Sequence, residues 1–147
     1  PKKGQHVHRE IKVGDRSRLD IVIAGEERPD ENNGAVYIEV KNVTMLSSVV
    51  SDRADFPDAV TERGRKHLRE LIRLKKMGHR AVLFLLLGRS DCNSVGFAQE
   101  IDPAYCEALL EAAEEGVEII SHKLAFRGSR MRLGEEVPID LPTQIPV

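Results

Sequence analysis

The sequence predicts an α/β fold with a mixed central β-sheet flanked by helices. Three segments that alternate in the manner of β-strands come first, and a long amphipathic helix then leads into the continuously apolar segment 81–87. A helix that crosses over to a fully buried strand is typical of parallel pairing, whereas the three opening strands meander, so the sheet is predicted to be mixed. The predicted strands are residues 8–13, 18–24, 35–43, 81–87, 117–123 and 130–138.

Two helices are indicated by signals at their ends. The first is predicted over residues 58–77, with Asp58 or Thr61 as its N-cap and Gly78 just past its end. The second is predicted over residues 103–115, with an aspartate before it and a glycine after it. The stretch between the third strand and the first helix has no clean period, so we expect a loop there.

The first helix has an apolar stripe and one unusual glycine. Val60, Leu68, Leu71 and Ile72 recur at helical spacing and are predicted to be buried. Gly64 lies inside the predicted helix, where glycine costs about 1 kcal/mol relative to alanine. A cost of this size indicates that another part of the chain approaches the helix closely at this position.

Charge is close to balanced overall but unevenly distributed. The chain of 147 residues has a net charge of -2, so it has no global attraction to nucleic acid or to an anionic membrane. Residues 61–80, however, contain eight Lys or Arg and only two acids, whereas residues 99–118 contain seven acids and no Lys or Arg. The cationic helix is a candidate phosphate-facing surface, although such a helix face often serves only to keep a protein solvated.

Several classes of protein are disfavoured by the sequence. Cys92 and Cys106 are too few and too far apart for a thiolate zinc site, and we find neither a signal peptide nor a membrane span. We therefore expect free thiols, a cytoplasmic location and no membrane partner. The length suits one domain spanning residues 1–147, and an opening Pro-Lys-Lys-Gly in place of Met indicates a fragment of a longer protein.

A short strand motif carries the candidate chemistry. Glu39 and Lys41 lie two residues apart on a predicted strand, so they share one face at a backbone spacing of about 6–7 Å. Asp20 lies on the preceding strand, which a single hairpin loop joins to this one, so its carboxylate can converge with Glu39 on one ion. The predicted site binds Mg²⁺ or Mn²⁺ through Asp20, Glu39 and the Val40 carbonyl, while Lys41 orients a water or stabilises developing charge.

The Glu-x-Lys motif also has explanations that involve no metal ion. A Glu-x-Lys triplet is expected by chance in about one of two chains of this length, and Glu10 to Lys12 is a second example. Only Glu39 has an aspartate on an adjacent predicted strand, which favours the metal site. A buried ion pair between Glu39 and Lys41, kept for structure alone, remains an alternative.

Three segments resemble the sugar fermentation stimulation protein A (SfsA) family: Ser17–Asp20, Tyr37–Lys41 and Phe56–Glu70. The third is long and distinctive, and the similarity extends from about Glu10 to the last strands. The resemblance implies the carboxy-terminal domain of that family, with a restriction-endonuclease-like PD-(D/E)XK nuclease core, without the family's amino-terminal OB-like domain. The family is described as binding DNA without sequence preference and as regulating maltose metabolism.

The resemblance also implies roles for individual residues. The two acids of the nuclease motif match Asp20 and Glu39, and its lysine matches Lys41. An initial helix often supplies a further acid in this fold, and Glu10 or Asp58 is the candidate for that place here. The predicted nucleic-acid-binding residues are Arg18, Thr61, Arg63, Lys66 and His67.

Two functions therefore stay open on the sequence alone. The first is a Mg²⁺-dependent nuclease domain that hydrolyses phosphodiester bonds in DNA. The second is a non-catalytic, sequence-nonspecific DNA-binding regulator of sugar metabolism that retains the nuclease scaffold. Either protein could also act as a homodimer.

Overall fold

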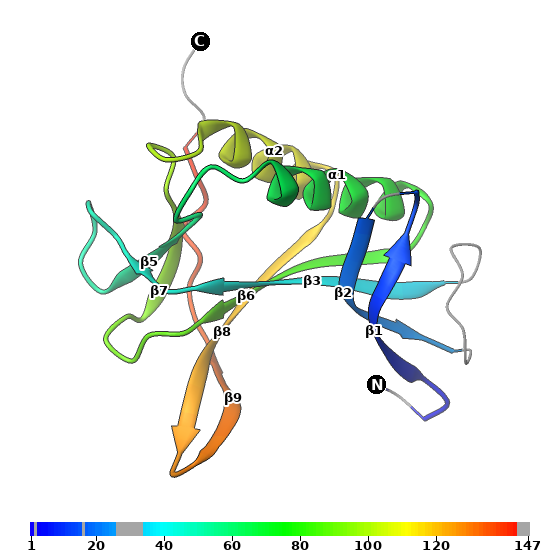
Figure 1. Ribbon diagram of the computed structural model, residues 1–147, viewed down its shortest axis with the longest axis horizontal. Helices are drawn as coiled ribbons and strands as arrows, with labels where there is room; N and C mark the ends of the chain where they lie inside the picture. Colours follow the sequence, from blue (N-terminus) through cyan, green and yellow to red (C-terminus); the bar gives the residue numbers. More distant parts are fainter. Residues whose placement is uncertain (2, 16, 26–33, 144–147) are drawn as a thin grey trace.

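A six-stranded mixed sheet forms the centre of the computed structural model, which describes residues 1, 3–15, 17–25 and 34–143 (Figure 1). The strands of this sheet are β1 (His6–Val13), β2 (Ser17–Ala24), β3 (Ala35–Val43), β6 (Arg80–Leu87), β8 (Glu118–Arg127) and β9 (Arg130–Glu136). They lie in the order β1–β2–β3–β6–β8–β9. The pairs β3–β6 and β6–β8 are parallel and the other neighbours are antiparallel, so the predicted mixed α/β fold is confirmed.

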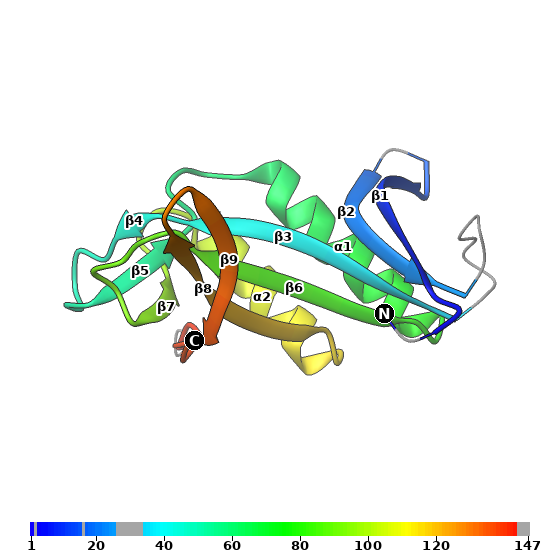
Figure 2. The same ribbon diagram turned by 90° about the horizontal axis from the view of Figure 1, so that it is seen from below.

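Both helices, α1 (Glu62–Lys76) and α2 (Pro103–Glu114), lie on one side of this sheet (Figures 1 and 2). Odd-numbered residues of β3 point toward them, and Tyr37 and Glu39 are buried. On the opposite face Ile38 and Val40 are only half-buried. No helix covers this opposite face among the described residues, because the two crossover helices pack on the same side.

The first helix begins later than predicted. Thr61 has an extended backbone, and its hydroxyl accepts a hydrogen bond from the Gly64 N–H at 2.9 Å, so Thr61 is the N-cap and Asp58 precedes the helix. Val60 consequently lies outside the helix and is 65% exposed, while Leu74 extends the buried stripe in its place. Gly78 follows the C-cap with a φ of +95°, as predicted for the residue that ends the helix.

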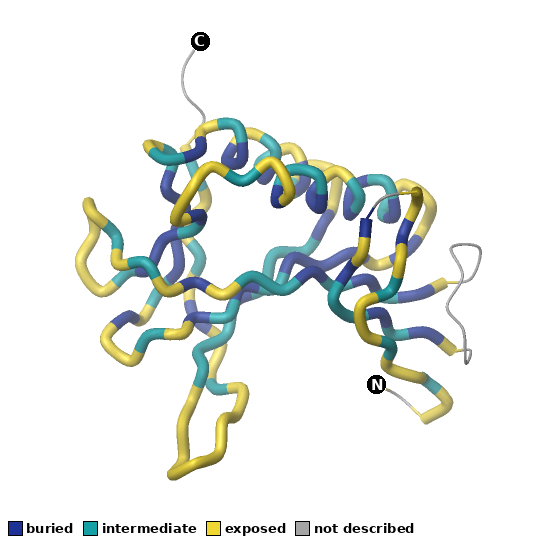
Figure 3. Tube along the Cα trace, in the orientation of Figure 1, coloured by how far each residue is buried: buried dark blue, intermediate teal, exposed yellow. Residues whose placement is uncertain are grey.

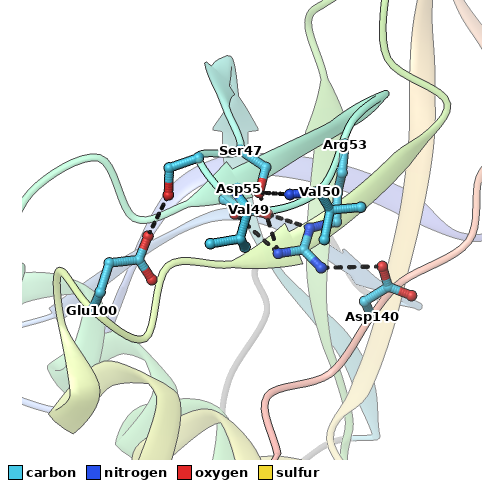
Figure 4. Close-up of polar contacts among 8 residues, drawn as sticks. Ser47, Val49, Val50, Arg53, Asp55, Glu100 and Asp140 are labelled. Atoms are coloured by element: carbon cyan, nitrogen blue, oxygen red, sulfur yellow. Dashed lines mark hydrogen bonds and ion pairs between the residues drawn. The ribbon is translucent and has the colours of Figure 1, made fainter.

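A second, three-stranded sheet was not predicted, and two of its strands lie in the stretch before α1 that was expected to be a loop. It consists of β4 (Met45–Leu46), β5 (Arg53–Phe56) and β7 (Ser94–Phe97) in the order β4–β5–β7. Within β5, Arg53 donates to both oxygens of the buried Asp55, at 2.7 and 3.1 Å, and it also donates to Asp140, which links β5 to the tail (Figure 4). These strands are two to four residues long, too short for their alternation to be recognised in the sequence.

The core lies between the helices and the face of the sheet they cover, where the buried positions of both helices point inward (Figure 3). Leu68 and Leu71 of α1 contribute to it together with Leu83 and Leu85 of β6. Both cysteines are free, as predicted, and both are buried. Within the described ranges, no helix is both long and apolar enough to cross a membrane.

Gly64 marks the contact between the two helices. A Cβ placed on Gly64 would lie 2.8 Å from Thr61 Cγ2 and 3.0 Å from Tyr105 Cε2 of α2. Thr61 cannot rotate away freely because its hydroxyl holds the cap hydrogen bond. The close approach predicted from the sequence is therefore confirmed.

We expect Gly64→Ala to lower the free energy of unfolding by about 1–3 kcal/mol, because overpacking outweighs the better helix propensity of alanine. Urea denaturation followed by circular dichroism measures this change. The double variant Gly64→Ala with Thr61→Ser removes the nearest methyl group and should recover part of the loss. An increase in stability for Gly64→Ala alone would contradict the packing described.

Candidate functional site

The site begins where β2 and β3 separate. Their ladder ends at the pair Ile21 and Ile38, and one step further the Val40 N–H donates to Asp20 Oδ2 at 2.8 Å in place of a backbone partner. The N–H and C=O of one strand residue point to the same edge, so the Val40 carbonyl also faces the gap between the strands. Asp20 thus contacts the backbone of Val40, and their role as metal ligands stays a prediction.

Glu39 lies next to this gap, under α1. It is only 2% exposed, and its Oε1 accepts a hydrogen bond from Lys41 Nζ at 2.6 Å and one from His67 Nδ1. His67 is itself buried at 5% exposure in the middle of α1. His67 was predicted to bind nucleic acid from the helix surface; its buried ring contacts Glu39 and also lines the basic pocket described below, and nucleic-acid binding by His67 stays a prediction.

The Glu39 carboxyl is held in its ionised form. Burial on its own would raise the pKa of this carboxyl, but the hydrogen bonds and positive charges of His67 and Lys41 outweigh burial, so the pKa is lowered from 4.5. Both donors engage Oε1, whereas Oε2 is buried and has no partner in the described part of the chain. A buried carboxylate oxygen without a hydrogen bond is costly, so Glu39 is suited to a cation that would bind Oε2.

The residues present fit a hard divalent cation of the Mg²⁺ type. Such an ion takes one or two carboxylates and completes its coordination with carbonyl oxygens, water and substrate, which matches Asp20, Glu39 and the Val40 carbonyl. Among the residues with described positions, no three His, Cys, Asp or Glu side chains form a cluster. Glu10 and Asp58 therefore do not join the pair as a third ligand.

The ion pair that the sequence offered as a purely structural alternative does exist. Lys41 contacts Glu39, and its side chain is 18% exposed, so it reaches the edge of the site. An ion pair alone leaves Glu39 Oε2 unaccounted for, because a group kept for structure is expected to have both oxygens satisfied. A metal ion bound at Oε2 would account for both the pair and the unpartnered oxygen.

A basic pocket adjoins the carboxylates. It lies between the first half of α1 and the end of the β1–β2 hairpin and has a volume of about 910 Å³. His67 belongs both to this pocket and to the Glu39 contact, so the two are neighbours. The pocket is lined by Lys12, Asp15, Ser17, Arg18, Glu62, Arg63, Arg65, Lys66, His67 and Arg69.

Most predicted nucleic-acid-binding residues lie in this pocket, with one exception. Arg18, Arg63 and Lys66 line it as a group. Thr61 does not, because its hydroxyl accepts the cap hydrogen bond and its N–H donates to Asp102 Oδ2 at 2.8 Å. The structure thus uses Thr61 to fix the start of α1, and a direct contact of Thr61 with nucleic acid stays a prediction.

Some cations of α1 pair with acids, including Arg65 with Asp102, and others do not. Lys76 pairs with Glu115 just after α2 at 3.2 Å, and Arg73 pairs with Glu70 at 3.0 Å. Arg63, by contrast, lies in the first half and has no acidic partner in the described part of the chain. The sequence showed one cationic and one anionic helix. It could not show that only some of the positive charges form ion pairs between the two.

Two residues of this region were missed by sequence analysis. The Tyr105 hydroxyl is buried without a partner, and burial, followed by the nearby Glu39 charge, raises its pKa. The Ser17 hydroxyl is also buried without a partner. Together with Glu39 Oε2 these are the buried side-chain polar atoms without a partner among the described residues, and all belong to this region. No local pattern could have identified them, because only the packing of α1 and α2 buries them.

The fold and the site define a mixed α/β domain with an acidic pair and a lysine on adjoining strands beside a basic pocket. Residues 1–130 match the family model described as "Sugar fermentation stimulation protein RE domain". The chain therefore belongs to the SfsA family, as the sequence resemblance implied.

Relatives in this family are moderately similar over most of the chain. A sugar fermentation stimulation protein homolog from Marinomonas sp. is 41% identical over 135 residues, covering 91% of this chain and 49% of that protein. A homolog from Citrifermentans bemidjiense is 39% identical, covering 92% of this chain and 54% of that protein. The solved structure of Pyrococcus furiosus SfsA in complex with Ca²⁺ is 28% identical, with a TM-score of 0.77, over 94% of this chain and 56% of that one. The chain thus spans about half the length of these relatives.

Glu39 should make stability depend on pH. The unfolded chain binds a proton at this carboxyl more readily than the folded protein does, because the folded pKa is lower than 4.5. The stabilisation is therefore present above that pH and is lost as pH falls through the folded pKa. We expect the difference in unfolding free energy between wild type and Glu39→Gln to be constant above about pH 5.5 and to shrink below pH 4.5.

Urea denaturation at a series of pH values measures this difference. Glu111→Gln is the matched control, since Glu111 is an exposed residue of α2. A difference that stays constant for Glu39→Gln down to about pH 3 would contradict the proposed interaction of Glu39 with His67 and Lys41.

Proposed function

We propose that this domain is a divalent-metal-dependent nuclease with a restriction-endonuclease-like PD-(D/E)XK core that hydrolyses phosphodiester bonds in DNA. The observation that carries the proposal is the buried Glu39 carboxylate, held ionised with one oxygen unpartnered, beside Asp20 at the point where two strands separate. The description of the family model as an RE domain supports it, and so does the Ca²⁺ complex of the Pyrococcus furiosus protein.

In this proposal, metal binding and positioning are assigned to different residues. Asp20 and Glu39, with the Val40 carbonyl, would hold Mg²⁺ or Mn²⁺. Bound there, the ion supplies a Lewis acid that polarises the phosphodiester and lowers the pKa of a coordinated water. His67 keeps Glu39 ionised and fixed in position, so it is a positioning residue.

Lys41 would act on the reacting atoms themselves, unlike His67. Its ammonium lies at the edge of the site and is partly exposed, so it can orient the attacking water or stabilise negative charge on the phosphate in the transition state. The water oxygen bonds to phosphorus as the bond to the leaving sugar oxygen breaks. The cations of the pocket, including Arg18, Arg63 and Lys66, bind backbone phosphates on either side and so place the strand.

The second candidate is a DNA-binding regulator that does not cut. The basic pocket favours it independently of the carboxylates, because phosphate binding needs only the cations, and the sugar fermentation stimulation of the family name is a regulatory description. A cleavage assay distinguishes the nuclease from the regulator. A measurement of metal affinity distinguishes both of them from a protein in which Glu39 and Lys41 form a purely structural ion pair.

We expect the domain to cleave labelled single- or double-stranded DNA in Mg²⁺ or Mn²⁺ and not in EDTA. Replacing Lys41 with Met should slow cleavage by at least about a hundredfold, because it removes a group that acts on the reacting atoms. Gel electrophoresis of the products under single-turnover conditions measures the rate. The matched control Lys3→Met removes an exposed lysine near the chain start and should cut normally.

Metal affinity is measured separately by calorimetry with Mn²⁺. Glu39→Gln should weaken binding by at least about tenfold, whereas Glu111→Gln should not change it. Metal binding without cleavage in any tested DNA would favour the regulator, with the nuclease residues vestigial or dependent on a further part of the protein. Mn²⁺ binding that is the same in Glu39→Gln and wild type would reject the metal site and leave the structural ion pair.

A further inference from the structure

We propose that the basic pocket between α1 and the β1–β2 hairpin is a dedicated seat for one phosphate group, separate from the phosphate that is cut. The residues that line the pocket support phosphate binding on their own. That this phosphate belongs to a nucleic acid rests on the proposed function.

The lining of the pocket has the charge that a phosphate requires. Of its ten residues, six are Lys or Arg and two are acids, although the whole chain has a net charge of -2. Arg63 and Arg69 have no acidic partner within the described ranges, so their guanidinium groups are available to an external anion. Arginine binds phosphate through two parallel N–H donors, which favours phosphate over a spherical anion such as chloride.

An unpartnered buried hydroxyl indicates that a ligand enters the pocket. Ser17 lines the pocket and is 3% exposed, and its Oγ has no hydrogen-bond partner in the part of the chain that the structure describes. Leaving a buried hydroxyl unpaired is costly, so a serine with no partner calls for an explanation. A phosphate oxygen would accept the hydroxyl proton and remove that cost.

The position and size of the pocket separate it from the cutting site. His67 lies in the shared wall, since it lines the pocket and contacts Glu39, but neither Asp20 nor Glu39 lines the pocket. A phosphate held by Ser17 is therefore a neighbour of the scissile phosphate along the strand. The volume of about 910 Å³ is that of a ligand cleft and exceeds what a single phosphate fills, so the attached nucleoside can enter as well.

Binding is tested in EDTA, where no cleavage takes place. Inorganic phosphate, added to the ¹⁵N-labelled domain, should shift the amide signals of Ser17 and of residues in the first half of α1. The double variant Arg63→Gln with Arg69→Gln should weaken phosphate binding by at least about tenfold, since each residue supplies a charge-assisted hydrogen bond.

A matched variant controls for the loss of charge. Arg130→Gln with Arg132→Gln removes the same charge from exposed positions on β9, at the opposite edge of the sheet from β1, and should leave phosphate affinity within about twofold. Equal weakening in both double variants, or no shift at Ser17, would overturn the proposal, because binding would then follow net charge alone.

Ser17→Ala distinguishes a ligand-binding hydroxyl from a structural one. If the hydroxyl serves the ligand, its removal should weaken phosphate binding while the urea denaturation midpoint stays the same or rises, because an unpaired buried group is lost. A lower midpoint with unchanged phosphate affinity would show a structural hydroxyl and contradict the proposal.

The source of the phosphate is decided with oligonucleotides of one sequence. Tighter binding of a 5′-phosphorylated strand than of its 5′-hydroxyl form, lost in the Arg63 and Arg69 double variant, assigns a terminal phosphate. Equal affinity for both forms and for a circular strand, again lost in that variant, assigns an internal phosphate. If the protein binds phosphate but never cuts DNA, the phosphate site is retained and the nuclease function is rejected. If the protein cuts DNA but added phosphate shifts no signals, the nuclease function is retained and the phosphate site is rejected.

Discussion

The hydrogen bonds that Glu39 receives from Lys41 and His67 are the interaction on which the site depends. They outweigh the burial that on its own would raise the pKa of the carboxyl, and they do so at a single oxygen. The consequence is a fixed, ionised carboxylate whose second oxygen is unpartnered in the described chain. The fold supplies this geometry because odd residues of β3 face α1, and His67 is on the turn of α1 that lies above Glu39.

The same helix serves a second purpose through its charges. Lys76 pairs with Glu115 just after α2 and Arg65 pairs with Asp102 just before it, so these cations help to hold the two helices together. Cations in the first half of α1 line the basic pocket beside Glu39. Gly64 allows the helices to approach closely enough for Tyr105 to pack near the site. One helix therefore connects the packing of the domain, the state of the carboxylate and the binding of an anion.

Much of the fold followed from patterns that are local in the chain. Strand alternation, the apolar run of β6 and the glycine after α1 were enough to place the main sheet and both helices. The short strands of the second sheet were missed, because two to four residues are too few to show strand alternation. The placement of Asp20 against the backbone of Val40, the residue after Glu39, follows from the hairpin that joins their strands. The inward position of His67 was not predicted, since only the three-dimensional packing shows which side of α1 faces Glu39.

The most direct test of the account is the position of a metal ion in crystals of the domain grown or soaked with Mn²⁺. Anomalous scattering identifies the ion without assumptions about its ligands. We predict one peak within coordination distance, about 2.1 Å, of Glu39 Oε2 and an Asp20 oxygen. A fully occupied peak at another place, with Glu39 still bound only by Lys41 and His67, would contradict the central claim that this carboxylate is prepared for a metal.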